Sequence, residues 1–418
     1  PTALRLTRTH PITEALASNG PDTINFALPG SGVQTIQLTG QLPTLSDLSG
    51  GITIDGYSQP GAQPNTDPLI SNAQIRIQIA GGGMNGFDAL WITSANNTVR
   101  GLAIYNIKRA LVLFGSVADQ NRIVGNFIGT DATTTFLSPT FVSGSHGISI
   151  DQGSSDNLIG TASLADRNVI SGNGQNGVSL YHEETDRNLI ANNIIGLSAD
   201  GTRRVQNWNM GIDINRAASF NTVGGMAPGM ANVVSGNNNE GVEISHYTTT
   251  TGNAIIGNYI GTDVSGRSAP DHTYNANRGI HIEDGVVDSI IMGNVIGNNR
   301  GGGIIIEGYY TRGTVVTQNL IGVSLNNSAI PNSVYGIRAS NHATDSRIGP
   351  GNIIAHNPVG VQVLDPTTDR HQITQNVIYN NTVLGIDLEP ALMVNLNDAG
   401  DTDTGATQQV NMPLLESA

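Results

Sequence analysis

Hydrophobic and polar residues alternate with a period of two along most of this chain, in short repeated phrases. Each phrase begins with Gly and places two small or aliphatic residues on either side of a variable one. Such alternation predicts strands with one face toward a core. The phrases are GISID (147–151), GVSLY (177–181), GIDIN (211–215), GVEIS (241–245), GIHIE (279–283), GIIIE (303–307), GIRAS (336–340), GVQVL (360–364) and GIDLE (385–389).

A second phrase, typified by NRIVGNFIG (121–129), recurs between the first ones. Strands this short cannot bury a face alone, so successive units must stack into a solenoid. From residue 97 the units are regular and begin 24 to 36 residues apart. Long insertions precede the Gly phrase in every second coil, which predicts loops along one edge on alternate rungs. The insertions are 129–147, 196–211, 261–279 and 322–336.

The pattern predicts an all-β fold, a single-stranded right-handed parallel β-helix solenoid with a short N-terminal capping helix. No helix period lies within the repeat, and Asn recurs at turn positions, where stacked side chains form hydrogen-bonded ladders. Residues 1–20 are expected to form the cap, because Ile12, Ala15 and Leu16 make an apolar helical stripe. We expect irregular first coils over 21–96, regular coils over 97–390, and an acidic loop and tail over 391–418 that would link to a further module.

Composition and charge exclude several kinds of binding partner and structural feature. The net charge of −14 argues against nucleic acid, which requires a basic surface. No run of 18 apolar residues occurs, so no transmembrane segment is expected. There is no cysteine, which excludes disulfides and thiolate metal sites. A first residue other than Met is compatible with a processed secreted protein.

Several phrases resemble those of bacterial right-handed parallel β-helix repeat proteins of the surface or secreted type. They are IDGYSQPGAQPNT (54–66), NRIVGNFIGTD (121–131), RNVISGNGQNGVSL (167–180) and NDAGDTDTG (397–405). The resemblance implies the same fold and an extracellular or cell-surface location. It also implies that the chain is part of a longer protein. It does not imply one activity, since the broad fold carries both enzymes and adhesins.

The Gly phrases also indicate which side chains point outward, because alternate residues of a strand face opposite ways. Neighbouring rungs of such a solenoid lie about 4.8 Å apart, so the central coils bring acidic and basic groups together on one face. The candidate catalytic residues on that face are Asp213, Glu243, His281, Glu283, Glu307 and Arg338.

Two kinds of chemistry fit this face. Carboxylates on neighbouring rungs would have roughly the 5 Å spacing of a retaining glycosidase, and those two rungs apart roughly the 6.5–9.5 Å of an inverting one. A polysaccharide lyase would instead use Arg338 or a cation to neutralise a uronate, with a base such as His281. The alternative is that these residues only form the polar, solvated outer row that any solenoid needs.

Further residues are candidates for ligand and metal binding. Aromatic and histidine side chains near the same face are predicted to contact a ligand: Tyr181, His182, Tyr247, Tyr309 and Tyr310. Near the C-terminal end, closely spaced oxygen ligands before Gly405 are typical of Ca²⁺ loops. This predicts a Ca²⁺ site at Asn397, Asp398, Asp401 and Asp403.

These observations favour an extracellular or cell-surface β-helix that acts as a structural or recognition module. It would bind glycans, or assemble with itself or with envelope proteins. The alternative is a polysaccharide lyase or glycoside hydrolase that uses the Asp213–Glu283 face. Because the protein is acidic, an anionic polysaccharide would need Ca²⁺ as a bridge.

Overall fold

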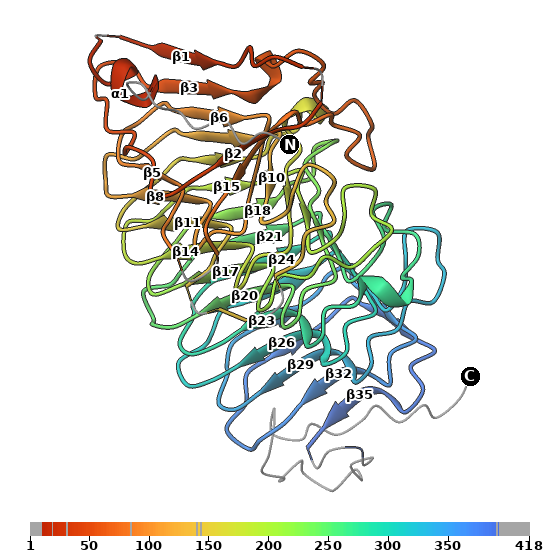
Figure 1. Cartoon of the computed structure of the whole chain (residues 1–418). Helices are drawn as coiled ribbons and strands as arrows, with labels where there is room; N and C mark the ends of the chain where they lie inside the picture. Colours follow the sequence, from red (N-terminus) through yellow and green to blue (C-terminus); the bar gives the residue numbers. More distant parts are fainter. Residues whose placement is uncertain are drawn as a thin grey trace, which may run out of the picture.

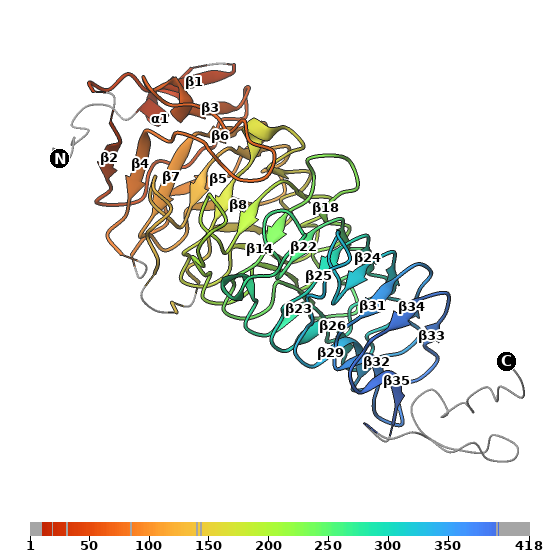
Figure 2. The same ribbon diagram turned by 90° about the vertical axis from the view of Figure 1, so that its right-hand side faces the viewer.

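The chain winds into an elongated solenoid whose coils follow one another in sequence order (Figures 1 and 2). The computed structural model describes residues 11–389 apart from 19, 31, 84–85, 139–140 and 143, together with residue 392. Over these residues the strands pair in parallel and form three sheets of 12, 12 and 11 strands. A regular coil gives one strand to each sheet, so the predicted all-β parallel β-helix is confirmed.

Sheets A and B are built mainly from strands of two to four residues. The strands of sheet A are β1 (Asp22–Asn25), β3 (Ile52–Asp55), β6 (Thr98–Arg100), β9 (Arg122–Val124), β12 (Leu158–Ile159), β15 (Leu189–Ile190), β18 (Thr222–Gly224), β21 (Ala254–Ile256), β24 (Ile290–Met292), β27 (Val315–Thr317), β30 (Arg347–Ile348) and β33 (Gln372–Ile373). The strands of sheet B are β2 (Gln34–Gln37), β4 (Ile77–Ala80), β7 (Leu102–Tyr105), β10 (Phe127–Ile128), β13 (Val169–Ile170), β16 (Ile194–Ile195), β19 (Val233–Val234), β22 (Tyr259–Ile260), β25 (Val295–Ile296), β28 (Leu320–Ile321), β31 (Ile353–Ala355) and β34 (Val377–Tyr379).

Sheet C contains the Gly phrases and has the longest strands. Its strands are β5 (Leu90–Ile92), β8 (Leu111–Phe114), β11 (Ile148–Asp151), β14 (Val178–Tyr181), β17 (Ile212–Asn215), β20 (Val242–Ser245), β23 (Arg278–Ile282), β26 (Gly302–Glu307), β29 (Tyr335–Ser340), β32 (Val359–Val363) and β35 (Leu384–Leu388). The described helices are short: α1 (Pro11–Ala15), η1 (Gly56–Ser58), η2 (Leu164–Asp166) and η3 (Asp271–Thr273).

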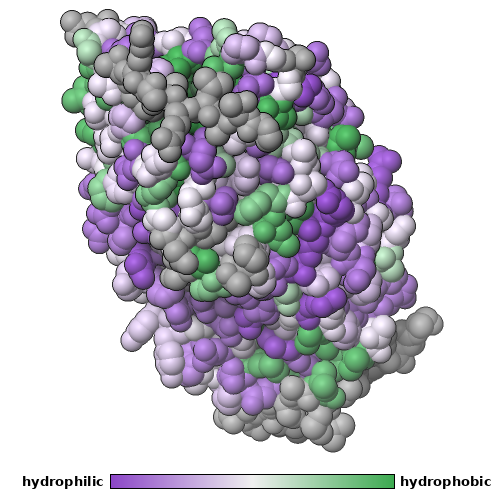
Figure 3. All heavy atoms as spheres, viewed as in Figure 1, coloured by the Kyte–Doolittle hydropathy of each residue, from purple (hydrophilic) through white to green (hydrophobic). Residues whose placement is uncertain are grey.

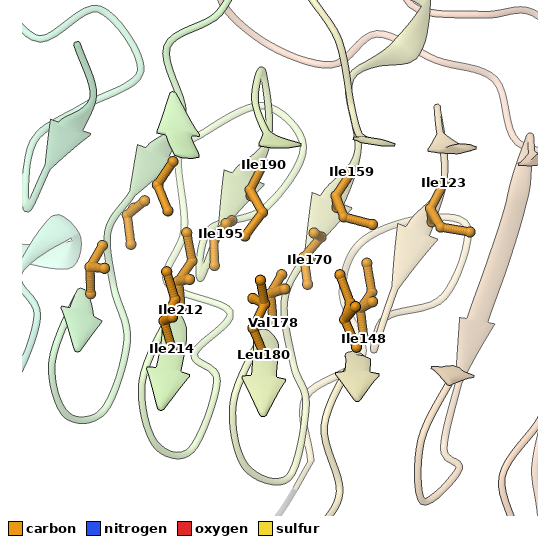
Figure 4. Packing of buried hydrophobic residues seen from close by; sticks show 14 of the residues in the cluster. Ile123, Ile148, Ile159, Ile170, Val178, Leu180, Ile190, Ile195, Ile212 and Ile214 are labelled. Carbon is orange, nitrogen blue, oxygen red and sulfur yellow. The ribbon is translucent and has the colours of Figure 1, made fainter. Parts of the chain in front are cut away.

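The inward side chains of the three sheets form one aliphatic core along the axis. From outside, hydrophilic residues cover most of the visible surface and hydrophobic residues lie in small groups (Figure 3). Inside, aliphatic side chains from successive coils stack on one another, as Ile148, Val178 and Ile212 do (Figure 4). All three are fully buried. Burial of these stacked side chains supplies the main stabilisation of the coils.

Three ladders of buried asparagines run beside the core. Along most of each ladder the side-chain amide of one Asn donates to the side-chain oxygen of the Asn one coil further on, as Asn232 does to Asn258 at 2.8 Å and Asn258 to Asn294 at 3.0 Å. From Asn121 to Asn157 the backbone N–H donates instead. Many of the amides also donate to backbone carbonyls, which satisfies buried groups of the turns. The ladders comprise Asn97, Asn121, Asn157, Asn188, Asn221 and Asn253; Asn126, Asn168, Asn193, Asn232, Asn258, Asn294, Asn319, Asn352 and Asn376; and Asn173, Asn207, Asn237, Asn275, Asn299, Asn332, Asn357 and Asn381.

The helix α1 lies at the N-terminal end of the core. Its Ile12 and Ala15 are buried, and Ile12 lines a small apolar cavity with Phe26 and Leu38. The helix has five residues, shorter than the predicted stripe because the chain turns immediately after Ala15. Its position agrees with the predicted cap.

Loops of alternate coils contact one another on the edge between sheets B and C. The amide of Ala199 donates to the hydroxyl of Thr134 at 3.1 Å, across two neighbouring insertions. Further along, the amide of Leu325 donates to the carbonyl of Gly266 at 3.0 Å. The predicted two-coil period of the insertions therefore produces a second, looser stack of loops outside the core.

Candidate functional site

The outward row of sheet C is buried rather than solvated. Residues that were predicted to lie opposite one another are direct ladder partners, as Asp213 is to Glu243 and Glu243 to His281. Of the nine residues in the row, only Arg338 is partly exposed. The flat, solvated row expected of a purely structural solenoid is therefore absent from this face. The row is Ser149, Ser179, Asp213, Glu243, His281, Ile305, Arg338, Gln362 and Asp387.

A further row, overlooked by the sequence analysis, supplies partners for these buried groups. It consists of the residue directly before each repeat glycine, which lies just before the sheet C strand in the earlier coils and is the first residue of the strand from β23 onward. Four of its members contact the outward row or its neighbours through hydrogen bonds or ion pairs. The sequence could have shown this row, because the residue before the glycine recurs with every Gly phrase. The row is His146, Asn176, Met210, Glu240, Arg278, Gly302, Tyr335, Val359 and Leu384.

His281, on β23, is the centre of a cluster of four carboxylates. Its Nε2 lies 2.9 Å from Glu307 Oε1 and 3.2 Å from Glu283 Oε2. Its Nδ1 lies 3.7 Å from both Glu240 Oε1 and Glu243 Oε2, which is too long for a hydrogen bond. The side chain of His281 is only 5% exposed, whereas those of Glu283 and Glu307 are 24% and 21% exposed. The cluster thus has a buried side and a side that ligands can reach.

Arg278 adds a positive charge at the edge of this cluster. Its guanidinium donates to Glu240 Oε1 at 3.2 Å and lies 3.9 Å from Glu307 Oε1. Asn277 donates to the same oxygen of Glu240 at 2.7 Å. The second oxygen, Oε2, is buried and has no hydrogen-bond partner within the described part of the chain, and neither has His281 Nδ1.

The crowding changes the proton affinities of these groups in different directions. Burial opposes protonation of His281, but the charges of Glu243, Glu307 and Glu283 prevail and raise its pKa to about 9. Burial raises the pKa of Glu283 to about 7. The hydrogen bond from His281 lowers the pKa of Glu307, and burial together with Glu243 raises that of Glu240. Near neutral pH, Glu283 therefore titrates beside an ionised Glu307 and a charged His281.

Asp213 forms a second centre two rungs from His281. Tyr181 and Asn176 donate to its Oδ2 at 2.8 and 2.9 Å, and Asn215 donates to its Oδ1 at 2.8 Å. Burial, assisted by the charge of Glu243, raises the pKa of Asp213 to about 7. Burial also raises the pKa of Tyr181. Tyr181, predicted as a ligand contact, is thus half-buried and anchored to Asp213.

Arg338 lies apart from the His281 cluster. The fully apolar Ile305 stands between it and His281 in the row. Its guanidinium packs over the ring of Tyr335, 4.0 Å from the ring centroid, and donates to Gln362 at 2.8 Å. The predicted grouping of Arg338 with the carboxylates is therefore not formed by direct contact.

Exposed aromatic side chains follow the turns after the same strands of sheet C. Tyr247, Tyr309 and Tyr310 are 58%, 59% and 72% exposed. Tyr309 stacks on His342 with ring centroids 3.8 Å apart and an interplanar angle of 21°. His182, the remaining predicted ligand contact, pairs with Asp151 at 2.6 Å. We call Tyr247, Tyr309, Tyr310 and His342 the aromatic edge.

Two groups of three residues in the described chain have the spacing of metal ligands. They are Glu240 with Glu243 and His281, and His281 with Glu283 and Glu307, and one ligand atom from each residue lies within 4.8 Å of the others. The predicted Ca²⁺ ligands Asn397, Asp398, Asp401 and Asp403 lie outside the described residues. Among the helices described, none has the length and apolar character to cross a membrane.

Comparison with known proteins does not assign this chain to a family. No protein-family model matches the chain, and no curated protein matches its sequence. Among solved structures it is similar to the A-module of the mannuronan C-5 epimerase AlgE4 of Azotobacter vinelandii (TM-score 0.40, 15% identity, 85% of this chain and 89% of that one). It is also similar to the Dettilon tailspike protein (0.37, 13%, 85% and 61%) and to the catalytic unit of a GH87 α-1,3-glucanase from Streptomyces thermodiastaticus (0.41, 11%, 83% and 62%). Because these TM-scores are below 0.5, the structural similarities do not indicate a function for this chain.

Proposed function

We propose that this protein is an extracellular or cell-surface recognition module that binds a glycan along the outer edge of sheet C. The main support is the aromatic edge, whose Tyr309 follows the accessible Glu307 at the end of β26 by two residues. An exposed aromatic ring offers an apolar face for the C–H face of a sugar, and neighbouring polar groups hydrogen-bond its hydroxyls.

The turns after the sheet C strands place the aromatic edge at the surface. Tyr247, Tyr310 and His342 have positive φ angles of 74°, 67° and 72°. The equivalent turn after β17 has the same backbone at Arg216 and Ala217, with φ angles of 54° and 75°. The conformation therefore belongs to the turn, and it is the exposure of the tyrosine rings that supports ligand binding.

Binding to a panel of neutral and acidic polysaccharides, with and without Ca²⁺, tests this proposal. We expect wild-type protein to bind at least one glycan and Tyr309→Ala to weaken that binding about 3- to 10-fold, the value of one aromatic contact. Tyr379→Ala is the matched control, because Tyr379 is an exposed tyrosine on β34 of sheet B. No binding across the panel, or equal loss in both variants, would overturn the proposal. Self-association in sedimentation that Tyr309→Ala abolishes would assign the edge to assembly instead.

The alternative function, a glycoside hydrolase, is favoured by one specific observation. Glu283 and Glu307 contact the same nitrogen of His281 and have pKa values shifted in opposite directions. Opposite shifts in a carboxylate pair are typical of an acid and a nucleophile. Their oxygens approach within 4.8 Å, near the roughly 5–5.5 Å between carboxyl groups in retaining enzymes.

In this alternative, Glu283 would protonate the glycosidic oxygen while Glu307 attacks the anomeric carbon and expels the leaving group. Water, deprotonated by Glu283, would then release the sugar from Glu307. We would assay new reducing ends and unsaturated uronate absorbance on any glycan that binds. Cleavage lost at least 100-fold in Glu307→Gln, and retained in the exposed-surface control Glu184→Gln, would establish the hydrolase. Binding without cleavage would leave the protein a recognition module.

A further inference from the structure

We infer that Glu240, Glu243 and His281 form a binding site for a divalent transition metal of the zinc class. The site is on the buried side of the His281 cluster, where the turn before β20 meets β20 and β23. The inference does not rest on the proposed glycan binding, because no residue of the aromatic edge is among the three ligands. All three residues are at least nine-tenths buried, with exposed fractions of 2%, 7% and 4%.

The first support is a pair of buried polar atoms that lack partners. His281 Nδ1 and Glu240 Oε2 are both inaccessible to solvent and make no hydrogen bond with any residue that the structure describes. Each buried polar atom without a partner costs about 1–3 kcal/mol. The carboxylate of Glu240 is a neighbour of the imidazole, with its Oε1 3.7 Å from His281 Nδ1, so a cation bound between the two groups would give both unpartnered atoms a ligand bond.

The second support is the spacing of the ligand atoms. His281 Nδ1 lies 3.7 Å from Glu240 Oε1 and 3.7 Å from Glu243 Oε2. These separations exceed a hydrogen bond, but they approach the roughly 3.3–3.6 Å between ligand atoms that share a tetrahedral zinc at about 2.0–2.2 Å. Three protein ligands are also the number in zinc sites that keep a position for water.

The third support is the hydrogen bond between the other imidazole nitrogen of His281, Nε2, and Glu307. His281 Nε2 lies 2.9 Å from Glu307 Oε1, so Nε2–H can donate to this carboxylate when a metal replaces the proton on Nδ1. A carboxylate that accepts from the distal nitrogen orients a metal-binding histidine and increases its basicity. Glu307 is therefore a positioning residue for the site. Asn277 and Arg278 fix the carboxylate of Glu240 by donating to its Oε1, which leaves Oε2 for a metal.

The donor set selects among metals. Ca²⁺ takes six to eight oxygen ligands, whereas an imidazole nitrogen with carboxylates suits Zn²⁺ and its neighbours in the first transition row. This site is distinct from the acidic segment 395–407 that the sequence predicts for Ca²⁺.

Equilibrium dialysis of metal-free, untagged protein against Zn²⁺ tests the inference, with bound metal measured by mass spectrometry and no glycan present. We expect one Zn²⁺ per chain, with affinity reduced 10- to 100-fold or more by Glu240→Gln and by Glu243→Gln. Glu184→Gln, on the exposed turn after β14, is the matched control and should bind like wild type. X-ray absorption at the zinc edge should show a nitrogen and oxygen shell at about 2.0–2.2 Å that includes an imidazole.

Three results would overturn the inference. One is the absence of stoichiometric zinc in wild-type protein. Another is undiminished zinc binding in both glutamine variants, which would place the metal on other histidines. The third is displacement of zinc by an equal concentration of Ca²⁺. Circular dichroism of each variant separates loss of metal from loss of fold.

Discussion

At the scale of single residues, the unusual feature of this protein is acidic side chains placed where they are difficult to ionise. Asp213 is nearly inaccessible, with 4% exposure, and Glu243 is its partner on the next rung. Removing a carboxylate from water and placing it beside another costs free energy, which appears as the raised pKa of Asp213. Stability alone would favour neutral polar residues here, so the charges are best understood as serving a ligand.

Asp213→Asn tests the cost of that burial. The pKa of Asp213 is about 7 in the folded protein and about 3.9 in an unfolded chain. Between these values the folded state holds more protons, so stability falls as pH rises, and the loss is complete above pH 7. We therefore expect Asp213→Asn to unfold at a higher temperature than wild type at pH 8.5. The advantage, on the order of a few kcal/mol, should disappear below about pH 4.

The surroundings of Asp213 can accept this substitution. The carboxamide oxygen that Asp213→Asn introduces could still accept from Tyr181. The Oδ1 of Asn215, which has no partner among the described residues, could accept from the new amide nitrogen if the side-chain amide of Asn215 rotates by half a turn. Melting temperatures of both proteins from pH 3.5 to 8.5 provide the measurement. A constant difference between the two proteins at every pH would contradict the raised pKa of Asp213.

At the scale of elements, the asparagine ladders fix the turns to which the short strands are attached. Sheets A and B contain many strands of two residues, which contribute few ladder hydrogen bonds of their own. Asn258 shows how the asparagine ladder supplies the hydrogen bonds that these short strands lack. It accepts from the backbone and side chain of Asn232, and it donates to Val223, Ile256 and Asn294 at 2.9–3.1 Å.

Asn258→Ala should therefore be strongly destabilising. It leaves buried donors and acceptors without partners on two coils, which we expect to cost about 2–4 kcal/mol. The measurement is the urea concentration at the unfolding midpoint, compared with Asn326→Ala in an exposed loop. Equal midpoints for the two variants would show that the ladders contribute little beyond what water can replace.

The elements also show what the sequence can predict. The Gly phrases predicted the pairing of Asp213 with Glu243 and of Glu243 with His281, because a parallel solenoid repeats its register in every coil. They did not predict that this row is buried. Burial depends on how the preceding turn approaches the strand, which the alternation of the strand itself does not encode. Glu240 and Arg278 were overlooked for the same reason, although both precede a repeat glycine.

At the scale of the whole molecule, the solenoid places different features along different edges. Alternate-coil loops stack between sheets B and C, whereas the aromatic edge follows the turns on the other side of sheet C. Sheet C thus lies between a wall of loops and a row of exposed rings. The acidic residues on its central coils contribute to a net charge of −14, which favours neutral glycans or ones bridged by a cation.

We predict that a bound glycan lies on this face of sheet C, and hydrogen exchange measured by mass spectrometry locates the residues that it covers. The comparison is between free protein and protein saturated with a glycan from the binding panel. We predict slower exchange over 243–248, 281–286 and 307–312, the ends of the central sheet C strands and the turns that follow them. Protection confined to the loop insertions at 196–211 and 261–279, or no change in sheet C, would contradict it.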